Sequence, residues 1–237
     1  MSENAATALV IGSGPGLGSA LVRLFATRGL DVVAVARGAS QRTRLQVADG
    51  AQVHPYDADI TDPAAVDRLF TWLRQSMPGP LALTVFNAGT LRPGSVLDIS
   101  PEDFEHCWRV GCFGGFLVGR AAAAVMREQG HGTLIFTGAT ASLRGGAGFV
   151  NLAAPKFGLR AVAQSMAREL APAGVHVAHV LIDGQIQSPS NEALLAERGP
   201  DSLLSADAIA ENYWHLHCQP RSAWTHELDL RPWVEKF

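Results

Sequence analysis

Short apolar runs alternate along this chain with longer segments in which apolar residues recur every three or four positions. The apolar runs predict strands at 7–11, 31–36, 51–55, 81–86, 132–137, 175–182 and 225–230. Strands that alternate with helices are typical of βαβ units around a parallel sheet. The pattern therefore predicts a single doubly wound α/β domain over residues 1–237, with a seven-stranded, mostly parallel sheet flanked by helices.

Helix boundaries can be read from capping residues. Asp62-Pro63 is expected to be an N-cap followed by the first helical residue of a helix that runs through Arg74. Ser100-Pro101 repeats this pattern, with acidic residues in the first turn. The segment 155–171 carries apolar residues at helical spacing and is predicted to be a helix.

The last fifty residues are less regular. Mixed periodicity at 188–205 predicts a substrate loop with partial helix, and 206–237 is expected to hold a helix, a strand and an aromatic tail. The aromatic residues there are Tyr213, Trp214, Trp224, Trp233 and Phe237. Such a tail either forms an interface, if it is exposed, or folds back on its own sheet. The sequence leaves both readings open.

Composition narrows the class of protein. With 237 residues, 47% of them hydrophobic, the chain can form one domain with a sizeable core. A formal charge of −3 gives no reason to expect a nucleic acid or an anionic membrane as a partner. The first apolar run is too short for a signal peptide, and no run approaches the roughly 20 residues of a membrane span. Three cysteines without metal-ligand spacing favour reduced thiols, a cytoplasmic protein and no metal site.

A glycine run follows the first strand. Gly12-Ser13-Gly14-Pro15-Gly16-Leu17-Gly18 leads into a predicted helix, and Gly12, Gly16 and Gly18 form a G-x-x-x-G-x-G pattern. A glycine-rich turn between a strand and a helix lets backbone N–H groups approach a pyrophosphate, and the helix N-terminus adds positive potential. The context therefore favours a dinucleotide site over a simple tight turn.

The end of the second strand bears on the choice of dinucleotide. Ala36 stands where an NAD enzyme usually has an acid for the ribose hydroxyls, and Arg37 follows it. A guanidinium beside the ribose 2′ position favours a phosphate, so NADP(H) is preferred over NAD(H). The alternative interpretation is that Arg37 is an ordinary solvated surface residue.

The stretch Leu152-Ala153-Ala154-Pro155-Lys156-Phe157-Gly158-Leu159, together with the glycine pattern, resembles the short-chain dehydrogenase/reductase family. The resemblance implies a Rossmann-type fold and further cofactor contacts at Asp59-Ile60, at Asn87-Ala88-Gly89 and along 183–188, where Asp183 replaces the family's proline. The expected cofactor site consists of Gly12, Ser13, Gly14, Gly16, Leu17, Gly18, Arg37, Asp59, Ile60, Asn87, Ala88, Gly89, Lys156, Gly184, Ile186 and Ser188.

The catalytic positions depart from the family pattern. Leu152 stands at the position of the family's tyrosine, Ala139 at that of its serine and Gly111 at that of its asparagine, so that only Lys156 remains. If the alignment slips by one residue, Thr140 or Ser142 could supply a hydroxyl. Loss of a positioned general acid costs about 10²–10⁴-fold in rate. The expected catalytic residues are Lys156 and Thr140, with a backbone-bonded hydroxyl as the alternative for Thr140.

Three hypotheses follow from this combination. The first is an NADP(H)-dependent oxidoreductase with a divergent active site. The second is a dinucleotide-binding pseudoenzyme, and the third is a non-redox enzyme that reuses the pocket. The first is preferred because Gly184, Ile186 and Ser188 persist beside Lys156. The resemblance also implies a homo-dimer or homo-tetramer, and the apolar residues expected around the site favour a small or hydrophobic substrate.

Overall fold

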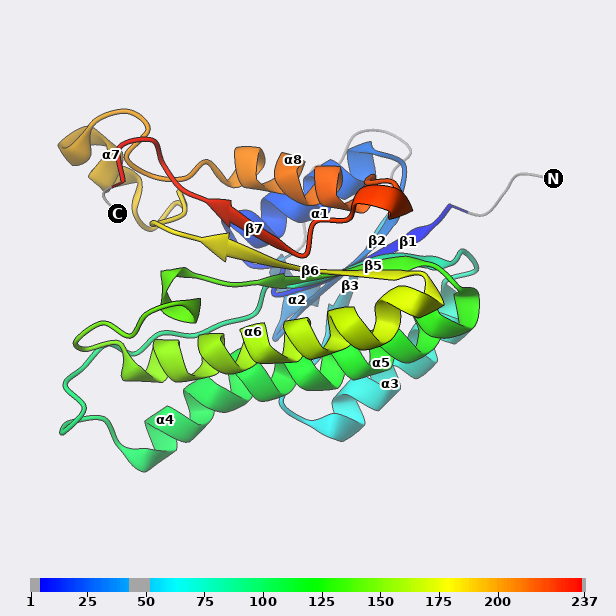
Figure 1. Ribbon diagram of the computed structural model, residues 1–237, viewed down its shortest axis with the longest axis horizontal. Coiled ribbons are helices and arrows are strands. Elements are labelled where there is room, and N and C mark those ends of the chain that lie inside the picture. The colour runs from blue at the N-terminus through cyan, green and yellow to red at the C-terminus, as the bar shows by residue number, and fades with distance from the viewer. Residues whose placement is uncertain (1–4, 43–51, 236–237) are drawn as a thin grey trace.

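Seven parallel strands form one sheet in the order β3-β2-β1-β4-β5-β6-β7 (Figure 1). The computed structural model describes residues 5–42 and 52–235. The strands are β1 (Thr7–Ile11), β2 (Asp31–Ala36), β3 (Val53–Asp57), β4 (Leu81–Phe86), β5 (Gly132–Thr137), β6 (Val175–Ile182) and β7 (Glu227–Leu230). Every neighbouring pair is parallel. The predicted doubly wound sheet is confirmed. The sequence predicted a mostly parallel sheet, and among the described residues every strand of the sheet is parallel.

Two predicted strands are displaced. The strand expected at 51–55 lies at Val53–Asp57, because β3 pairs with β2 from Val32↔Val53 to Ala36↔Asp57 and so follows the length of its neighbour. Residue 51 lies outside the described residues. The strand expected at 225–230 begins at Glu227, where pairing with β6 starts at His179.

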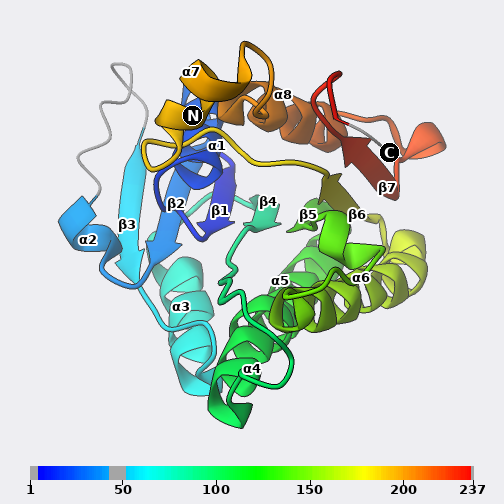
Figure 2. The same cartoon turned by 90° about the vertical axis from the view of Figure 1, so that its left-hand side faces the viewer.

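Helices cover both faces of the sheet (Figures 1 and 2). On one face lie α1 (Leu17–Thr27) and α8 (Ala206–His217), and on the other lie α3 (Pro63–Ser76), α5 (Gly114–Gln129) and α6 (Val150–Leu170). Three shorter helices are α2 (Ala39–Arg42), α4 (Pro101–Trp108) and α7 (Glu192–Arg198). This arrangement leaves the carboxyl ends of the strands facing the viewer in Figure 2.

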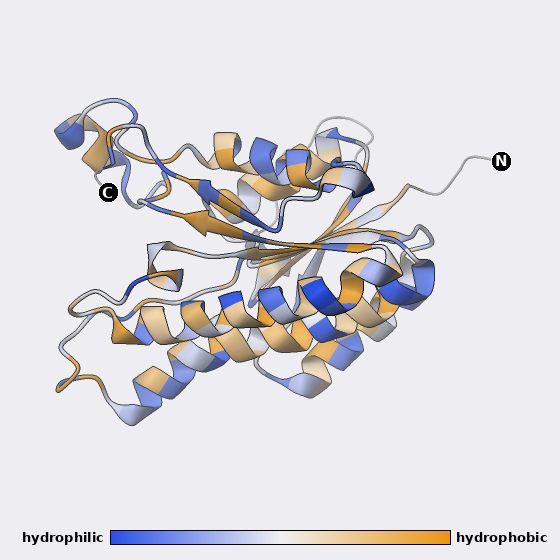
Figure 3. Ribbon diagram, in the orientation of Figure 1, coloured by the Kyte–Doolittle hydropathy of each residue, from blue (hydrophilic) through white to orange (hydrophobic). Residues whose placement is uncertain are grey.

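The sheet separates two apolar cores because successive side chains of a strand point to opposite faces. Leu9 and Ile11 belong to the core under α3, α5 and α6, whereas Ala8 and Val10 belong to the core under α1 and α8. Apolar colour accordingly runs along the strands in Figure 3. Strands buried on both faces explain why the sequence shows continuous apolar runs rather than alternation.

The predicted helix caps are confirmed. The Asp62 carboxylate accepts hydrogen bonds from the backbone N–H groups of Ala64 and Ala65 at 3.0 and 3.2 Å, with Pro63 as the first helical residue. The Ser100 hydroxyl accepts from Asp103 N at 3.1 Å and starts α4. Each cap satisfies backbone donors that a helix start leaves without an intrahelical partner.

Helices α4 and α5 are joined without a break by a π-helical turn, Arg109–Phe113. The continuous helix Pro101–Gln129 is long and apolar enough, by length and composition alone, to cross a membrane. The expectation that no segment has this character is therefore wrong. Of its most apolar window 56% is buried inside the protein, as in the core helix of a folded domain.

Helix α6 begins at Val150, five residues before the predicted start at Pro155. The prediction placed the proline at the first helical position, where its missing N–H costs nothing. In the structure the Pro155 ring is buried, and a Cβ atom added to Gly111 in the π-helical turn would lie 3.0 Å from Pro155 Cβ. The proline thus fills space left by a glycine, and this packing offsets its missing hydrogen bond.

The C-terminal aromatic residues were expected either to be exposed at an interface or to fold back on the sheet, and both cases occur. Tyr213 is fully buried, Trp214 is half-buried, and Trp224 stacks on His176 with ring centroids 4.9 Å apart. Only Trp233 of the described aromatics of the tail is largely exposed, at 82%. Phe237 lies outside the described residues. The tail therefore folds back on its own sheet over most of its length.

We predict that Tyr213→Phe destabilises the protein. The Tyr213 hydroxyl lies 2.9 Å from Thr137 Oγ1, and both side chains are buried. Removal of one partner leaves the other unsatisfied and should lower the free energy of unfolding by about 1–3 kcal/mol. Urea denaturation measures this loss. The double variant Tyr213→Phe/Thr137→Val removes both polar groups and should recover part of it; an equal or larger loss would contradict the paired role.

Candidate functional site

A cleft of about 310 Å³ opens at the carboxyl ends of β1 to β4. Its lining comprises Ile11, Gly12, Gly14, Val35, Ala36, Arg37, Ala58, Asp59, Ile60, Thr61, Asn87, Ala88, Gly89, His106 and Val110. Open parallel sheets bind ligands at this edge, where the strand order reverses. Eight residues of the expected cofactor site, from four separate segments of the chain, thus line one cleft: Gly12, Gly14, Arg37, Asp59, Ile60, Asn87, Ala88 and Gly89.

The glycine turn is closely packed where glycines stand. A Cβ atom at Gly18 would lie 2.2 Å from the Gly12 carbonyl oxygen, and one at Gly12 would lie 2.8 Å from Ala88 N. Gly12 and Gly16 also have positive φ angles of 88° and 90°. The Asn87 side-chain amide donates to Gly12 O at 3.1 Å. The turn and the loop after β4 therefore form one rigid unit.

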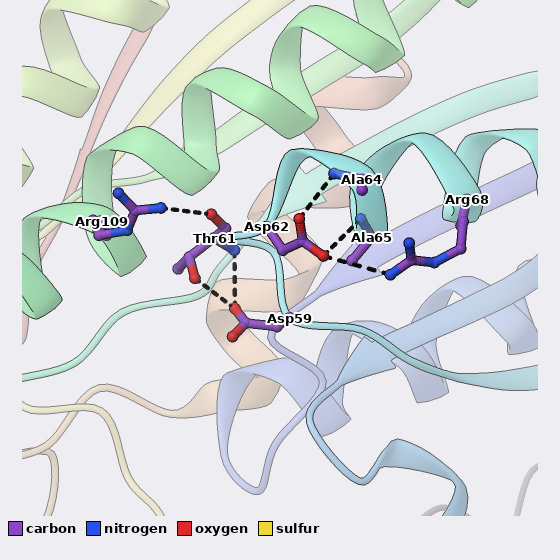
Figure 4. Close-up of polar contacts among 7 residues, drawn as sticks. All are labelled: Asp59, Thr61, Asp62, Ala64, Ala65, Arg68 and Arg109. Carbon is purple, nitrogen blue, oxygen red and sulfur yellow. Dashed lines mark hydrogen bonds and ion pairs between the residues drawn. The ribbon is translucent and has the colours of Figure 1, made fainter.

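Asp59 is held at the mouth of the cleft by its own loop (Figure 4). Its Oδ1 atom accepts from the backbone N–H of Thr61 at 2.9 Å and from the Thr61 hydroxyl at 2.8 Å. The backbone hydrogen bond is the main reason why the pKa of Asp59 is lowered; the Thr61 hydroxyl and the charge on Arg37 add to it. Arg109 from the π-helical turn donates to Thr61 O at 3.2 Å and fixes this loop.

Seven lining residues are not in the expected cofactor site: Ile11, Val35, Ala36, Ala58, Thr61, His106 and Val110. Thr61 follows the predicted pair Asp59-Ile60, and His106 and Val110 come from α4 and the π-helical turn. The i, i+4 spacing of His106 and Val110 places them on one face of a helix. The sequence shows this spacing, but it does not show that this face of the helix is turned toward the cleft.

The remaining expected cofactor residues lie outside the lining of this cleft. Ser13, Leu17 and Gly18 belong to the turn and the start of α1, and Gly16 approaches the loop after β6: its Cβ would lie 3.5 Å from Ser188 Cβ. In that loop Ile186 forms a β-bridge with Leu204, which anchors the segment 184–188. Gly184, Ile186 and Ser188 therefore lie on a separate loop that comes close to the glycine turn.

Lys156 is a buried ammonium beside the cleft. The residue is 7% exposed, and its Nζ atom donates to Thr137 O at 2.7 Å. A Cβ atom added to Gly89, which lines the cleft, would lie 3.8 Å from that Nζ. Burial lowers the pKa of Lys156 to about 8, because the charged form loses hydration.

Three residues stand at the positions that the resemblance assigns to the family's tyrosine, serine and asparagine. Leu152 is half-buried one turn before Lys156 on α6, Ala139 is half-buried after β5, and Gly111 is buried in the π-helical turn. None of these three side chains carries a polar atom. Pro155 occupies the space beside Gly111, so an asparagine could not enter there without movement of α6.

Thr140 belongs to a polar chain that the sequence did not reveal. Its hydroxyl donates to the Asp183 carboxylate, and Asp183 forms an ion pair with Arg231 at 3.2 Å. Arg231 in turn pairs with Asp229. The chain joins the loops after β5 and β6 to the C-terminal strand. The sequence left two roles open for the Thr140 hydroxyl, catalysis or a hydrogen bond to nearby backbone. In the structure it bonds instead to the side chain of Asp183.

A second polar group lies behind Lys156. His179 on β6 is fully buried, and its Nδ1 atom lies 3.1 Å from Glu227 Oε1. The Arg160 guanidinium donates two hydrogen bonds to the Glu227 carboxylate, at 2.6 Å to Oε1 and 2.8 Å to Oε2. Burial lowers the pKa of His179 to about 4, against a smaller opposing effect of Glu227, while the charges on Lys156 and Arg160 lower it further. His179 is therefore neutral at pH 7. Its Nε2 atom has no hydrogen-bond partner among the residues that the structure describes.

The cysteines offer no nucleophile at the cleft. Cys107 and Cys112 are buried, as expected of small core residues, and burial raises the pKa of both thiols. Cys218 is an exposed free thiol at the C-terminal end of α8. Within residues 5–42 and 52–235, no group of three His, Cys, Asp or Glu residues could hold a metal ion.

The chain belongs to the short-chain dehydrogenase/reductase family, a family of oxidoreductases. The sequence profile of the short chain dehydrogenase family matches residues 6–198. A crystal structure of a short-chain dehydrogenase from Rhodopseudomonas palustris is 38% identical, has a TM-score of 0.82 and covers 96% of this chain and 99% of that one. The resemblance identified from Lys156 and the glycine turn is confirmed.

Two relatives illustrate the range of activities around this chain. The 3-oxoacyl-[acyl-carrier-protein] reductase MabA of Mycobacterium avium is 32% identical over 186 residues, which are 78% of this chain and 69% of the relative. The 1-deoxy-11-beta-hydroxypentalenate dehydrogenase of Streptomyces exfoliatus is 34% identical over 219 residues, 87% of this chain and 78% of the relative. One name denotes a reductase of an acyl chain and the other a dehydrogenase of a hydroxylated acid.

We predict that Gly18→Ala disrupts the glycine turn. The new methyl group would lie 2.2 Å from the Gly12 carbonyl oxygen, so the backbone must shift. Overpacking of this kind costs about 1–3 kcal/mol, which thermal or urea denaturation would register. Gly14→Ala is the matched control, since nothing lies within 4 Å of a Cβ atom there. Equal stabilities for the two variants would contradict the close approach of α1 to the turn.

Proposed function

We propose that this protein is an NADP(H)-dependent oxidoreductase that acts on a small or hydrophobic carbonyl compound or alcohol through a divergent active site. The observation that carries this proposal is the position of the Lys156 ammonium. It lies behind Gly89, at the wall of a cleft built from the glycine turn and the loops after β2, β3 and β4. A chain that had lost its ligand would have no need of this arrangement.

The shape of the cleft fits a dinucleotide. The N–H groups of Gly12 and Ser13 donate to Val35 O at 2.8 and 3.2 Å, and the open space at Gly14 would admit a pyrophosphate beside the start of α1. Ile60 and the Asp59 loop would hold the adenine, and Asn87, Ala88 and Gly89 would border the adjoining ribose. Ile186 and Ser188 would hold the carboxamide of the nicotinamide. When bound, such a cofactor supplies or removes a hydride.

The residues of this chain then have distinct tasks. Lys156 would hold a ribose hydroxyl of the nicotinamide half with one of the two N–H bonds that Thr137 leaves free, because an ammonium carries three donors. Leu152 and Ala139 would present apolar surface to the substrate and keep water away from the reacting carbon. Thr140, joined to Asp183, would fix the loop on which Ala139 lies.

The preference for NADP(H) rests on Arg37. It is exposed, lines the cleft and lies close enough to Asp59 for its charge to lower the pKa of that carboxyl. Ala36, the residue before it, offers no carboxylate that would repel a 2′-phosphate. A guanidinium at this place can form charge-assisted hydrogen bonds with the phosphate.

The substrate class follows from the apolar lining and the relatives. Leu152 and Ala139 replace two polar groups of the family pattern, so the reacting end of the substrate meets an apolar wall. The two relatives described above are named for a 3-oxoacyl chain and for a hydroxylated acid. We therefore propose a 3-oxoacyl compound or a similar apolar ketone or alcohol.

We also propose a homo-dimer or homo-tetramer in the cytoplasm. Phe104, Trp108, Phe116 and Phe157 are between 38% and 44% exposed on α4, α5 and α6. Large apolar side chains exposed on several helices of one layer favour an interface there. The cytoplasmic assignment rests on the three free cysteines.

A pseudoenzyme that binds the dinucleotide without turnover is the second candidate function. The observation that favours it is the loss of every polar side chain at positions 111, 139 and 152. A non-redox enzyme in the same pocket would convert its substrate with no net change in the cofactor.

We expect NADPH oxidation with at least one carbonyl compound. A panel of 3-oxoacyl thioesters, cyclic ketones and aldehydes can be followed by the loss of NADPH absorbance, with NADPH binding measured separately by fluorescence. Turnover supports the oxidoreductase. Binding without turnover across the panel would leave the pseudoenzyme, and binding of neither nucleotide would remove the whole proposal. Conversion that consumes no NADPH would favour the non-redox enzyme.

Arg37→Ala should weaken NADPH binding by about 10- to 100-fold, the effect of losing a charged hydrogen bond worth about 1.5–3 kcal/mol. NADH lacks the 2′-phosphate, so its affinity should change by less than about threefold. Arg168→Ala is the control: Arg168 lies in the last turn of α6 and bonds to Gln164 O, so its replacement should alter the affinity for neither nucleotide. A parallel loss of NADPH and NADH affinity in Arg37→Ala would contradict the recognition of the phosphate.

A further inference from the structure

Carbonyl reduction in this protein needs a proton source that the family pattern does not supply. The chain's only tyrosines are Tyr56 and Tyr213. Tyr56 packs against Trp72, with ring centroids 5.0 Å apart. Tyr213 is buried in the core under α1 and α8, on the face of the sheet opposite α6, and its hydroxyl bonds to Thr137. Neither phenol can reach the cleft, so the proton must come from another group.

The neighbouring polar side chains are already engaged. The Thr140 hydroxyl gives its one hydrogen to Asp183. Ser142 is fully buried and accepts from Ala139 N at 3.2 Å. Asn151 is fully buried too, and its amide nitrogen donates to Arg92 O at 2.5 Å. The Thr140 hydrogen is thus committed to a buried carboxylate, the Ser142 hydroxyl is enclosed in the core, and an amide such as that of Asn151 does not release a proton at neutral pH.

We propose that Lys156 is itself the proton donor to the carbonyl oxygen in reduction, and the proton acceptor in alcohol oxidation. The assignment rests on the oxidoreductase function proposed above. Among the described residues Nζ makes one hydrogen bond, to Thr137 O at 2.7 Å, which leaves one N–H bond for a ribose hydroxyl and one for the substrate oxygen. Gly89 provides no side chain between Nζ and the cleft. Leu152, one turn earlier on α6, carries no phenol that would stand between the lysine and the substrate.

The surroundings of Nζ favour transfer of its proton. Burial lowers the pKa of Lys156 to about 8, near the value at which a general acid works best at neutral pH. Among the described residues no carboxylate forms an ion pair with Nζ, and the Asp183 carboxylate pairs with Arg231 instead. His179 on β6 is neutral at pH 7, Glu227 on β7 is held by Arg160 of α6, and burial raises the pKa of Cys112 in the π-helical turn.

The proposed step balances as follows. As a hydride adds to the carbonyl carbon, the electron pair of the C=O bond moves to the oxygen. That oxygen takes one proton from the Lys156 ammonium, which becomes a neutral amine. The amine regains a proton from water before the next cycle, and the reverse sequence oxidises the alcohol. The dinucleotide carries both electrons, and no further oxidant or reductant is needed.

The first test is a direct titration of the side chain in the protein without cofactor. The sequence contains only two lysines, Lys156 and Lys236, so ε-¹³C lysine labelling gives two resonances, and Lys236→Arg assigns them. We expect the Lys156 resonance to titrate with a midpoint at about 8. A midpoint at an ordinary lysine value of about 10.4 would overturn the assignment, whatever the protein's activity proves to be.

The second test separates proton donation from ribose binding. Lys156→Arg keeps a cation and its donors, but a guanidinium with a pKa above about 12 does not release a proton at working pH. With acetoacetyl-coenzyme A, or the best compound of the panel, we expect NADPH affinity within about fivefold of wild type and turnover at least about 100-fold lower. Turnover within tenfold of wild type would overturn the assignment.

The wild-type protein provides a third readout that requires no substitution. Because the donor must be protonated, kcat/KM for reduction should fall as the pH rises through about 8. A rate independent of pH up to 10 would overturn the proposal. Absence of any NADPH oxidation would instead end the proposed function, while the ¹³C titration would still report its own midpoint, so the two failures can be told apart.

Discussion

The site depends on the contacts of one residue, Thr137, at the end of β5. Its backbone carbonyl accepts the Lys156 ammonium from the α6 side, and its hydroxyl pairs with Tyr213 from the α8 side. The strand end is therefore fixed from both layers of helices at once. Without the carbonyl, the ammonium would have to be buried with no protein acceptor, which costs several kcal/mol. The orientation of α6 and the position of its only lysine follow from this contact.

The residues at the positions matched to the family's tyrosine, serine and asparagine bear on the packing of the site as well as on its proposed chemistry. The Pro155 ring packs against Gly111, in the space that an asparagine side chain at position 111 would need. Asp183, in place of a proline, ties the loop after β5 to the C-terminal strand through Thr140 and Arg231. These contacts pack apolar groups beside Lys156 and link the loops after β5 and β6 to the C-terminal strand.

The fold followed from local patterns. Apolar runs predicted all seven strands, and the Asp62-Pro63 and Ser100-Pro101 pairs marked their helix starts, because capping is a contact between residues two or three apart. The start of α6 was misplaced because Pro155 packs against Gly111, 44 positions earlier in the chain. The side chains that support the site lie similarly far apart: Thr140 meets Asp183, and His179 meets Glu227. Periodicity carries no signal for such pairs, whereas the glycine turn and Lys156 could be identified from short motifs.

The central claim is that four separate segments of the chain form one dinucleotide site that ends at Lys156. Hydrogen–deuterium exchange with and without NADPH tests it most directly, because the readout needs neither a substrate nor a substitution. The account predicts slower exchange together in the segments around Gly12, Arg37, Asp59 and Asn87, and no change in α3. Protection confined to another part of the chain, or none at saturating NADPH, would contradict it.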